Sequence, residues 1–145
     1  MKTGISWALT LFVCFVFIQS LFFKFSGSQE TVIIFNTIAD WMQGIFLAPL
    51  AESFRTYGGW TVGITELIAS LLLLVPRTRL LGALIGFAVI SGAIFFHLFT
   101  PLGVDRVVDE AGNTDNGVLF YMACGVWLSC VILVGLESGK SKSTK

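Results

Sequence analysis

Residues 80–100 read LLGALIGFAVISGAIFFHLFT, a run of 21 residues without an aspartate, glutamate, lysine or arginine. About 20 apolar residues are enough for an α-helix to cross the hydrocarbon core of a bilayer. Three other runs of similar character lie at residues 5–23, 60–75 and 118–136. Pro76 and Pro101 close the second and third runs. The sequence therefore predicts four transmembrane helices, at about 5–25, 58–75, 79–100 and 117–136.

The composition of the chain leads to the same conclusion. Charged residues make up 12% of its 145 residues and hydrophobic residues 55%, whereas a soluble domain has about 25% charged residues. A soluble domain of this size cannot bury so much apolar surface, so lipid must cover the remainder. We predict one domain, residues 1–145, with an all-α fold: an integral membrane four-helix bundle. A net charge of zero, without a basic patch, argues against a nucleic-acid partner.

The first run has some features of a secretory signal peptide, because Lys2 precedes an apolar stretch. Its apolar character continues to Phe25, however, and no small-residue cleavage site follows promptly. We interpret it as a retained transmembrane helix.

Residues 29–47 are predicted to form an amphipathic helix between the first and second spans. Asn36, Asp40 and Gln43 recur at helical spacing, and Trp41 suits the headgroup level. Such a helix lies in the membrane interface rather than across it. Ser28 is suited to cap its start, with Glu30 in the first turn. The opposite, apolar face consists of Phe35, Ile38, Met42 and Ile45.

The distribution of lysine and arginine predicts the topology. With four spans and a cytoplasmic N-terminus, six basic residues lie inside and three lie outside, which obeys the positive-inside rule. Both termini are then cytoplasmic, with a basic tail at 137–145, and the amphipathic helix is extra-cytoplasmic. A fifth span would move the basic tail outside. The inside residues are Lys2, Arg77, Arg79, Lys140, Lys142 and Lys145; the outside ones are Lys24, Arg55 and Arg106.

Ionisable residues in or beside the spans are the main functional signal, because charge inside a membrane is costly and usually faces the bundle interior. Lys24, Glu66 and His97 fall at similar depth towards the outer surface, and Tyr121 is a weaker fourth member. We predict that they form a polar cluster that binds a headgroup or relays a proton. Simpler roles compete: Lys24 extends its amine to the surface, His97 ends a helix at headgroup level, and Glu66 makes a structural hydrogen bond.

Small residues on helix faces predict close packing of neighbouring helices. Gly63 shares a face with Glu66, and Gly82, Gly86 and Ala93 share a face with His97. The three cysteines lie inside apolar runs, so we predict neither a disulfide framework nor a metal site. Those cysteines are Cys14, Cys124 and Cys130.

Six short segments follow one another in a characteristic order and spacing: FFKFSG (22–27), TELIA (65–69), PRT (76–78), LGA (81–83), GA (92–93) and HLFTPLG (97–103). Together they resemble the DoxX family of small bacterial membrane proteins, over a range from Ser20 to about Leu133. The resemblance implies a four-helix bundle in the bacterial inner membrane, with Lys24, Glu66 and His97 at the family's recurrent polar positions. The loop after Gly103 and Tyr121 are less typical.

The resemblance also implies a function, because DoxX-like proteins are associated with thiosulfate-to-quinone electron transfer and with oxidative-stress responses. We therefore expect an accessory protein or subunit of a membrane redox system, linked to a quinone or a sulfur compound, with a membrane or periplasmic redox partner. The chain has no redox motif of its own, so we do not expect it to act as an enzyme alone. The alternatives are a carrier of a small solute or protons, acting through Glu66, and an assembly protein acting through residues 31–50.

Overall fold

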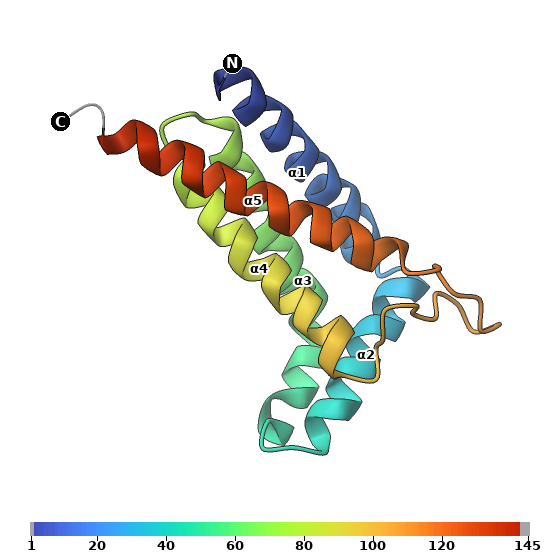
Figure 1. Ribbon diagram of the computed structural model, residues 1–145. Helices are drawn as coiled ribbons and strands as arrows, with labels where there is room; N and C mark the ends of the chain where they lie inside the picture. The colour runs from blue at the N-terminus through green and yellow to red at the C-terminus, as the bar shows by residue number, and fades with distance from the viewer. Residues whose placement is uncertain (1, 143–145) are drawn as a thin grey trace.

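The computed structural model describes residues 2–142, and five helices account for most of them (Figure 1). Four of the helices are long and apolar enough to cross a membrane. The predicted all-α fold with four spanning helices is thereby confirmed. The five helices are α1 (Lys2–Phe25), α2 (Gln29–Gln43), α3 (Ala48–Leu74), α4 (Arg79–Phe99) and α5 (Val118–Lys142).

The four long helices form a bundle in which α1 packs on α3, α3 on α4, α4 on α5 and α5 on α1 (Figure 1). The start of α1, the end of α5 and the turn at residues 75–78 lie at one end, which we call the terminal end. Helix α2 and the loop of residues 100–117 lie at the other end, which we call the loop end.

Apolar side chains fill the middle of the bundle, and large apolar side chains also cover its outside. Phe15 and Phe22 on α1 are 63% and 74% exposed. A bilayer is the environment that covers such a surface without cost. The fully or almost fully buried residues at the middle are Val13, Phe17, Ala69, Leu73, Val126 and Cys130.

The predicted amphipathic helix is present as α2, but it is shorter than expected and more covered. The Ser28 hydroxyl accepts a hydrogen bond from the Thr31 amide at 3.3 Å, as a helix cap does. The helix ends at Gln43 rather than at 47. Its apolar face is covered by protein, because Ile38 and Met42 pack with Ala51, Leu102 and their neighbours.

The second spanning helix begins ten residues before the predicted start at 58. Helix α3 starts at Ala48, with Pro49 in its first turn, where the missing amide hydrogen costs nothing. Residues 48–57 include the charged Glu52 and Arg55, so the apolar run that predicted this span begins only after them, at residue 60. Arg55 donates to Asp40 of α2 at 2.6 Å, and α2 therefore pairs with this first part of α3 as a helical hairpin.

Helix α5 also extends further than predicted. It continues through the start of the tail expected at 137–145 and ends at Lys142, while residues 143–145 lie outside the described range. The preceding loop contains one isolated bridge between Val107 and Thr114. At its end, Gly117 has a φ of +77°, a conformation that favours glycine and lets the chain turn into α5.

Candidate functional site

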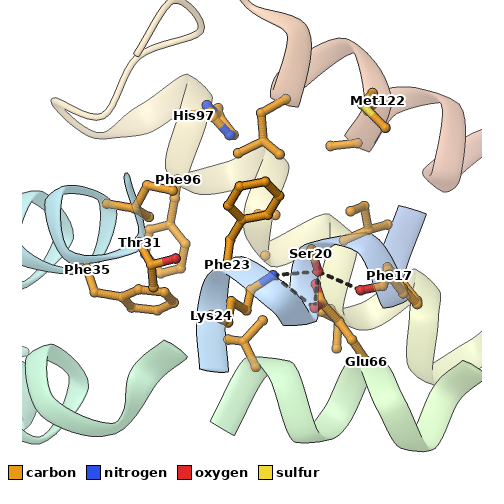
Figure 2. A pocket seen from close by; sticks show the side chains of 18 of the residues that line it. Phe17, Ser20, Phe23, Lys24, Thr31, Phe35, Glu66, Phe96, His97 and Met122 are labelled. Carbon is orange, nitrogen blue, oxygen red and sulfur yellow. Dashed lines mark hydrogen bonds and ion pairs between the residues drawn. The ribbon is translucent and has the colours of Figure 1, made fainter. Parts of the chain in front are cut away.

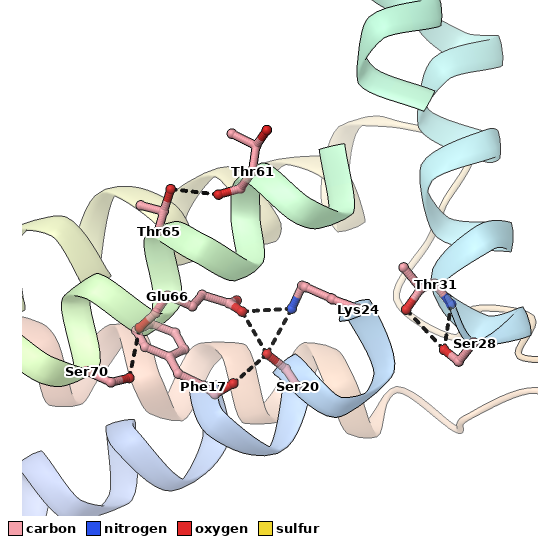
Figure 3. Close-up of polar contacts among 9 residues, drawn as sticks. All are labelled: Phe17, Ser20, Lys24, Ser28, Thr31, Thr61, Thr65, Glu66 and Ser70. Carbon is pink, nitrogen blue, oxygen red and sulfur yellow. Dashed lines mark hydrogen bonds and ion pairs between the residues drawn. The ribbon is translucent and has the colours of Figure 1, made fainter. Parts of the chain in front are cut away.

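Three polar side chains meet between α1 and α3 (Figure 3). The amine of Lys24 donates to Glu66 Oε2 at 2.9 Å and to the Ser20 hydroxyl at 2.9 Å. The Ser20 hydroxyl lies 2.7 Å from the same carboxylate oxygen. Ser20 and Lys24 are one helical turn apart on α1, so both side chains reach the same point on α3.

The carboxylate of Glu66 is almost completely buried: its side chain is 7% exposed and that of Lys24 is 17% exposed. Burying one charge alone would be strongly unfavourable, and pairing with the opposite charge offsets that cost only when hydrogen bonds complete the geometry. Ser20 provides one such bond. Close approach of α1 and α3 is possible beside this pair because Gly63 has no side chain, and the Phe25 ring lies in that space.

A cavity of about 470 Å³ adjoins this ion pair at the loop end (Figure 2). All five helices and the loop line it, mostly with apolar side chains. Its volume is within the range of small-molecule sites, which are largely apolar with a few polar groups that fix orientation. The titratable residues in its wall are Lys24, Glu30, Glu66, His97, Arg106 and Asp115.

His97 lines the same cavity but does not bond to the ion pair. Its Nδ1 atom lies 2.6 Å from the Gly103 carbonyl oxygen. Because a carbonyl can only accept, Nδ1 carries the hydrogen. The ring also packs edge-on against Phe120, with 5.7 Å between centroids. In Figure 2 the Phe23 ring lies between His97 and the Lys24–Ser20–Glu66 group.

The structure does not place Tyr121 in the cluster, which corrects the prediction. Its side chain is 66% exposed. Leu119, Met122 and Ala123 line the cavity from α5. A helix turns by about 100° per residue, which directs Tyr121 away from the face that these three form.

The predicted packing residues make three kinds of contact. Gly82 lies against the backbone of α3, so that an added Cβ would come within 2.7 Å of the Leu73 nitrogen. Gly86 faces the Phe17 ring, with an added Cβ at 3.2 Å. Ala93 lines the cavity.

Arg106 is a site residue that the sequence reasoning missed. Its side chain is 2% exposed. It pairs with Glu30 of α2 and lies 3.2 Å from Asp115 of the loop. Among the described residues, its Nη1 atom has no hydrogen-bond partner. A loop arginine is usually solvated, but the flanking Val104 and Val107 were a signal that this one turns inward.

A second buried network lies at the terminal end and was also missed. Arg79 is 1% exposed and stacks over Trp7, with 4.2 Å from its guanidinium carbon to the ring centroid. It donates to the Leu73 carbonyl at 3.0 Å and lies 3.8 Å from Glu137. Ser6 donates to Glu137 at 3.0 Å. The sequence reasoning placed Arg79 among the cytoplasmic basic residues and Glu137 at the start of the basic tail, and gave neither a partner.

Comparisons of the chain with models of protein families, with curated proteins and with solved structures find no match. The resemblance to the DoxX family therefore stays a prediction from the sequence. Within residues 2–142 no three histidine, cysteine or acidic side chains are grouped so as to hold a metal ion. The arrangement described above is a largely apolar cavity of about 470 Å³ with a buried, hydrogen-bonded ion pair in its wall.

Proposed function

We propose that this chain is a DoxX-like accessory subunit of a membrane redox system, and that its cavity binds a quinone or a small sulfur compound. We place it in the bacterial inner membrane with both termini in the cytoplasm. The loop end then faces the extra-cytoplasmic side, where a membrane or periplasmic redox partner would bind. One observation carries the proposal: a cavity of about 470 Å³ ends on a buried, hydrogen-bonded Lys24–Glu66 pair.

The residues at this end of the cavity suit a carbonyl oxygen. The amine of Lys24 has three hydrogens, of which two are directed to Ser20 and Glu66. The third is available to an acceptor on the ligand. A bound quinone would supply the capacity to accept electrons from a partner, and Lys24, held by Glu66 and Ser20, would orient its carbonyl oxygen.

The middle of the bundle supports binding in preference to the alternative of solute or proton conduction. The polar groups near Glu66 and those near Arg79 are separated by a buried layer of mostly apolar side chains, including Val13 and Val126, which also contains the hydroxyls of Thr10 and Ser70. A proton or polar solute crossing the bundle would have to pass through this layer, at the cost of losing its hydrogen bonds.

The test is native mass spectrometry of the protein released from mild detergent, with Glu66→Gln as the variant. We expect a retained small molecule on the wild-type chain and its loss from Glu66→Gln, with the same helical content by circular dichroism. The control is Thr65→Val, a neighbouring polar position that lines the cavity outside the ion pair.

The redox part of the proposal is tested in membranes. Quinone reduction should fall in a deletion strain and recover with the wild type but not with Glu66→Gln. A bare wild-type chain together with unchanged quinone reduction would overturn the proposal.

A second function, in assembly of a membrane complex, is favoured by one specific feature. The turn between α2 and α3 and the start of α3 expose apolar side chains: Phe46 in the turn is 87% exposed, and Leu50 of α3 is 58% exposed. Under this function Phe46→Ser with Leu50→Ser would reduce the amount of assembled redox complex in membranes, while Glu66→Gln would not. Val32→Ser, an exposed apolar position on α2, is the control.

A further inference from the structure

The cavity opens on the side of the bundle, as its partly exposed wall residues show. The wall residues that are also exposed at the surface are Gln19 and Phe23 of α1, Thr61 of α3, Ala88 of α4 and Val118 of α5. Phe23 and Val118 lie at the ends of their helices. Gln19 is six residues before the end of α1 and Ala88 is 11 residues before the end of α4, so these two positions lie about 9 Å and about 16 Å inside the apolar spans. A molecule at this opening is therefore in contact with lipid.

The loop end, in contrast, is covered. Leu102 and Arg106 of the loop are 8% and 2% exposed, and both line the cavity. Arg106 is held there by Glu30 of α2 and by Asp115. Helix α2 and the loop thus close the cavity towards water, which leaves the lipid side as the route of entry.

The charges in the wall argue against an anionic ligand. Two cations, Lys24 and Arg106, face three carboxylates, those of Glu30, Glu66 and Asp115. Even with a protonated His97 the wall has no net positive charge. An anion transferred from water into such a site loses its hydration without gaining a free counter-charge.

The same wall nevertheless has unused hydrogen-bond donors. The Nη1 group of Arg106 has no partner among the described residues, and Lys24 has one N–H beyond its two bonds. Buried donors in native proteins are normally satisfied, so a ligand with an acceptor oxygen would complete the site.

We propose that the cavity takes an uncharged, lipid-soluble molecule with an acceptor oxygen, which enters from the bilayer at the side of the bundle. This inference rests on the proposal that the cavity binds a small molecule, and it specifies the class: a carbonyl-bearing lipid-soluble compound rather than a sulfur oxyanion or a fatty-acid anion.

The test uses two photoactivatable probes with the same chain, of which only one has an ionisable headgroup: hexadecanoic acid with a diazirine in its chain, and the methyl ester of that acid. The full-length protein in lipid nanodiscs is irradiated with each probe at equal membrane concentration, and labelled peptides are identified by mass spectrometry. We expect the ester to label the cavity segments 16–24 and 118–123 about tenfold more than the acid does, which corresponds to about 1.4 kcal/mol.

Matched glycine variants separate cavity labelling from general contact with lipid. An added Cβ meets no atom within 4 Å at Gly92, which lines the cavity, or at Gly135, which lies towards the terminal end. Gly92→Leu should abolish most ester labelling of the cavity segments, and Gly135→Leu should not change it. For the entrance, Phe23→Ala should change the rate of ester labelling, while the neighbouring Phe22→Ala, outside the cavity, should not.

Three outcomes of the labelling experiment distinguish the ligand class from the binding and redox proposals. Equal or stronger labelling by the acid would overturn the inference on ligand class and leave the binding proposal standing. Ester labelling that Gly92→Leu does not reduce would place the probe on the outer surface and overturn the inference as well. Cavity labelling by the ester in a protein whose deletion leaves quinone reduction unchanged would support this inference and overturn the redox proposal.

Discussion

Glu66 shows how a single ionised side chain is tolerated inside an apolar bundle. Lys24 neutralises it, Ser20 hydrogen-bonds to it, and its own backbone carbonyl accepts from the Ser70 hydroxyl at 2.8 Å. Removing one member of a buried pair leaves the other charge uncompensated and costs about 3–5 kcal/mol, whereas removing both can be nearly neutral. The Lys24–Glu66 pair therefore adds little to the net free energy of folding, and its main effect is to fix the positions of the two charged groups in the site.

That reasoning predicts strong non-additivity between Lys24→Met and Glu66→Gln. Each single variant should lower the thermal unfolding midpoint, and the double variant should lower it by much less than the sum, with a coupling free energy of about 2 kcal/mol. The measurement is thermal unfolding in one detergent, followed by circular dichroism. Additive effects would show that the two side chains do not act as a pair. Glu52→Gln, at a 74% exposed side chain, should leave the midpoint unchanged.

At the scale of helices, the contact between α3 and α4 is set by backbone rather than side chains. At Gly82 an added Cβ would lie 2.7 Å from the Leu73 nitrogen and 2.9 Å from the Ala69 oxygen, and neither atom can rotate away. At Gly63 the nearest atom, at 2.6 Å, belongs to the Phe25 ring, which can move. Gly82 therefore sets the distance between two helix backbones, whereas Gly63 makes room for one aromatic ring.

We predict opposite effects of alanine at two glycines of α4. Gly82→Ala should force α3 and α4 apart and destabilise the protein by about 2 kcal/mol, as overpacking does. Gly92→Ala meets no atom within 4 Å and should stabilise the helix by about 0.5 kcal/mol, because alanine loses less backbone entropy than glycine. Chemical unfolding in mixed micelles would check both, and a stabilising Gly82→Ala would contradict the packing argument.

The loop of residues 100–117 contains a titratable turn outside the membrane-spanning helices. The side-chain amide of Asn113 donates to Asp109 at 2.7 Å, and this bond, followed by the Asn113 backbone amide, lowers the pKa of Asp109 below its usual value. Because the folded-state pKa is depressed, the stabilisation of the turn is fully present above the unfolded-state pKa. It is lost as the pH falls through the folded-state pKa.

We therefore expect the turn at 109–113 to loosen on acidification and to be unaffected between pH 6 and 8. The amide resonances of Asn113 should shift with the titration of Asp109 in NMR spectra recorded down to about pH 3. Asp109→Asn should remove that pH response, while Asp105→Asn, in the same loop, should retain it. A titration centred at or above the usual aspartate pKa would contradict the assigned hydrogen bonds.

In the molecule as a whole, the network at the terminal end joins segments from opposite ends of the chain. Glu137 of α5 accepts from Ser6 of α1 and lies beside Arg79 of α4, whose guanidinium covers Trp7. Arg79 also donates to the Leu73 carbonyl of α3, so all four spanning helices are connected at this end by polar contacts.

We predict that Arg79→Met destabilises the protein by about 3 kcal/mol, because a buried charge partner is lost. Arg79→Lys should restore only part of this, since lysine lacks the planar donor group that stacks on Trp7 and bonds to the Leu73 carbonyl. Arg77→Met, in the same turn but exposed, is the matched control. Thermal unfolding would check the order of the three variants, and equal midpoints for Arg77→Met and Arg79→Met would contradict it.

Hydropathy was sufficient to predict the spanning helices, because a long apolar run in a membrane can satisfy its backbone hydrogen bonds by forming a helix within the run itself. It could not place the start of α3 at Ala48, since the hydrogen bonds of Arg55 to Asn36 and Asp40 extend that helix beyond the apolar run. Depth in the membrane predicted that Lys24 and Glu66 would be neighbours. Depth alone does not give the direction of a side chain, so the Gly103 contact of His97 was missed.

The buried arginines were missed for a different reason. Arg79 and Arg106 lie next to turns, where a charge usually faces water, and their partners are distant in sequence. Glu137 is 58 residues from Arg79, and Glu30 is 76 residues from Arg106. Sequence periodicity reports on one helix at a time, and such pairs become visible only when the helices are arranged in space.

The position of Glu137 in the last helix bears on how the protein is made. During synthesis α4 is made before α5, so Arg79 is at first without the carboxylate of Glu137. A chain that stops before Glu137 retains a membrane-embedded arginine without that counter-charge, which is the kind of defect that membrane proteases and insertion chaperones detect. We therefore expect the bundle to reach its full stability only when the fourth span is complete and Glu137 lies beside Arg79.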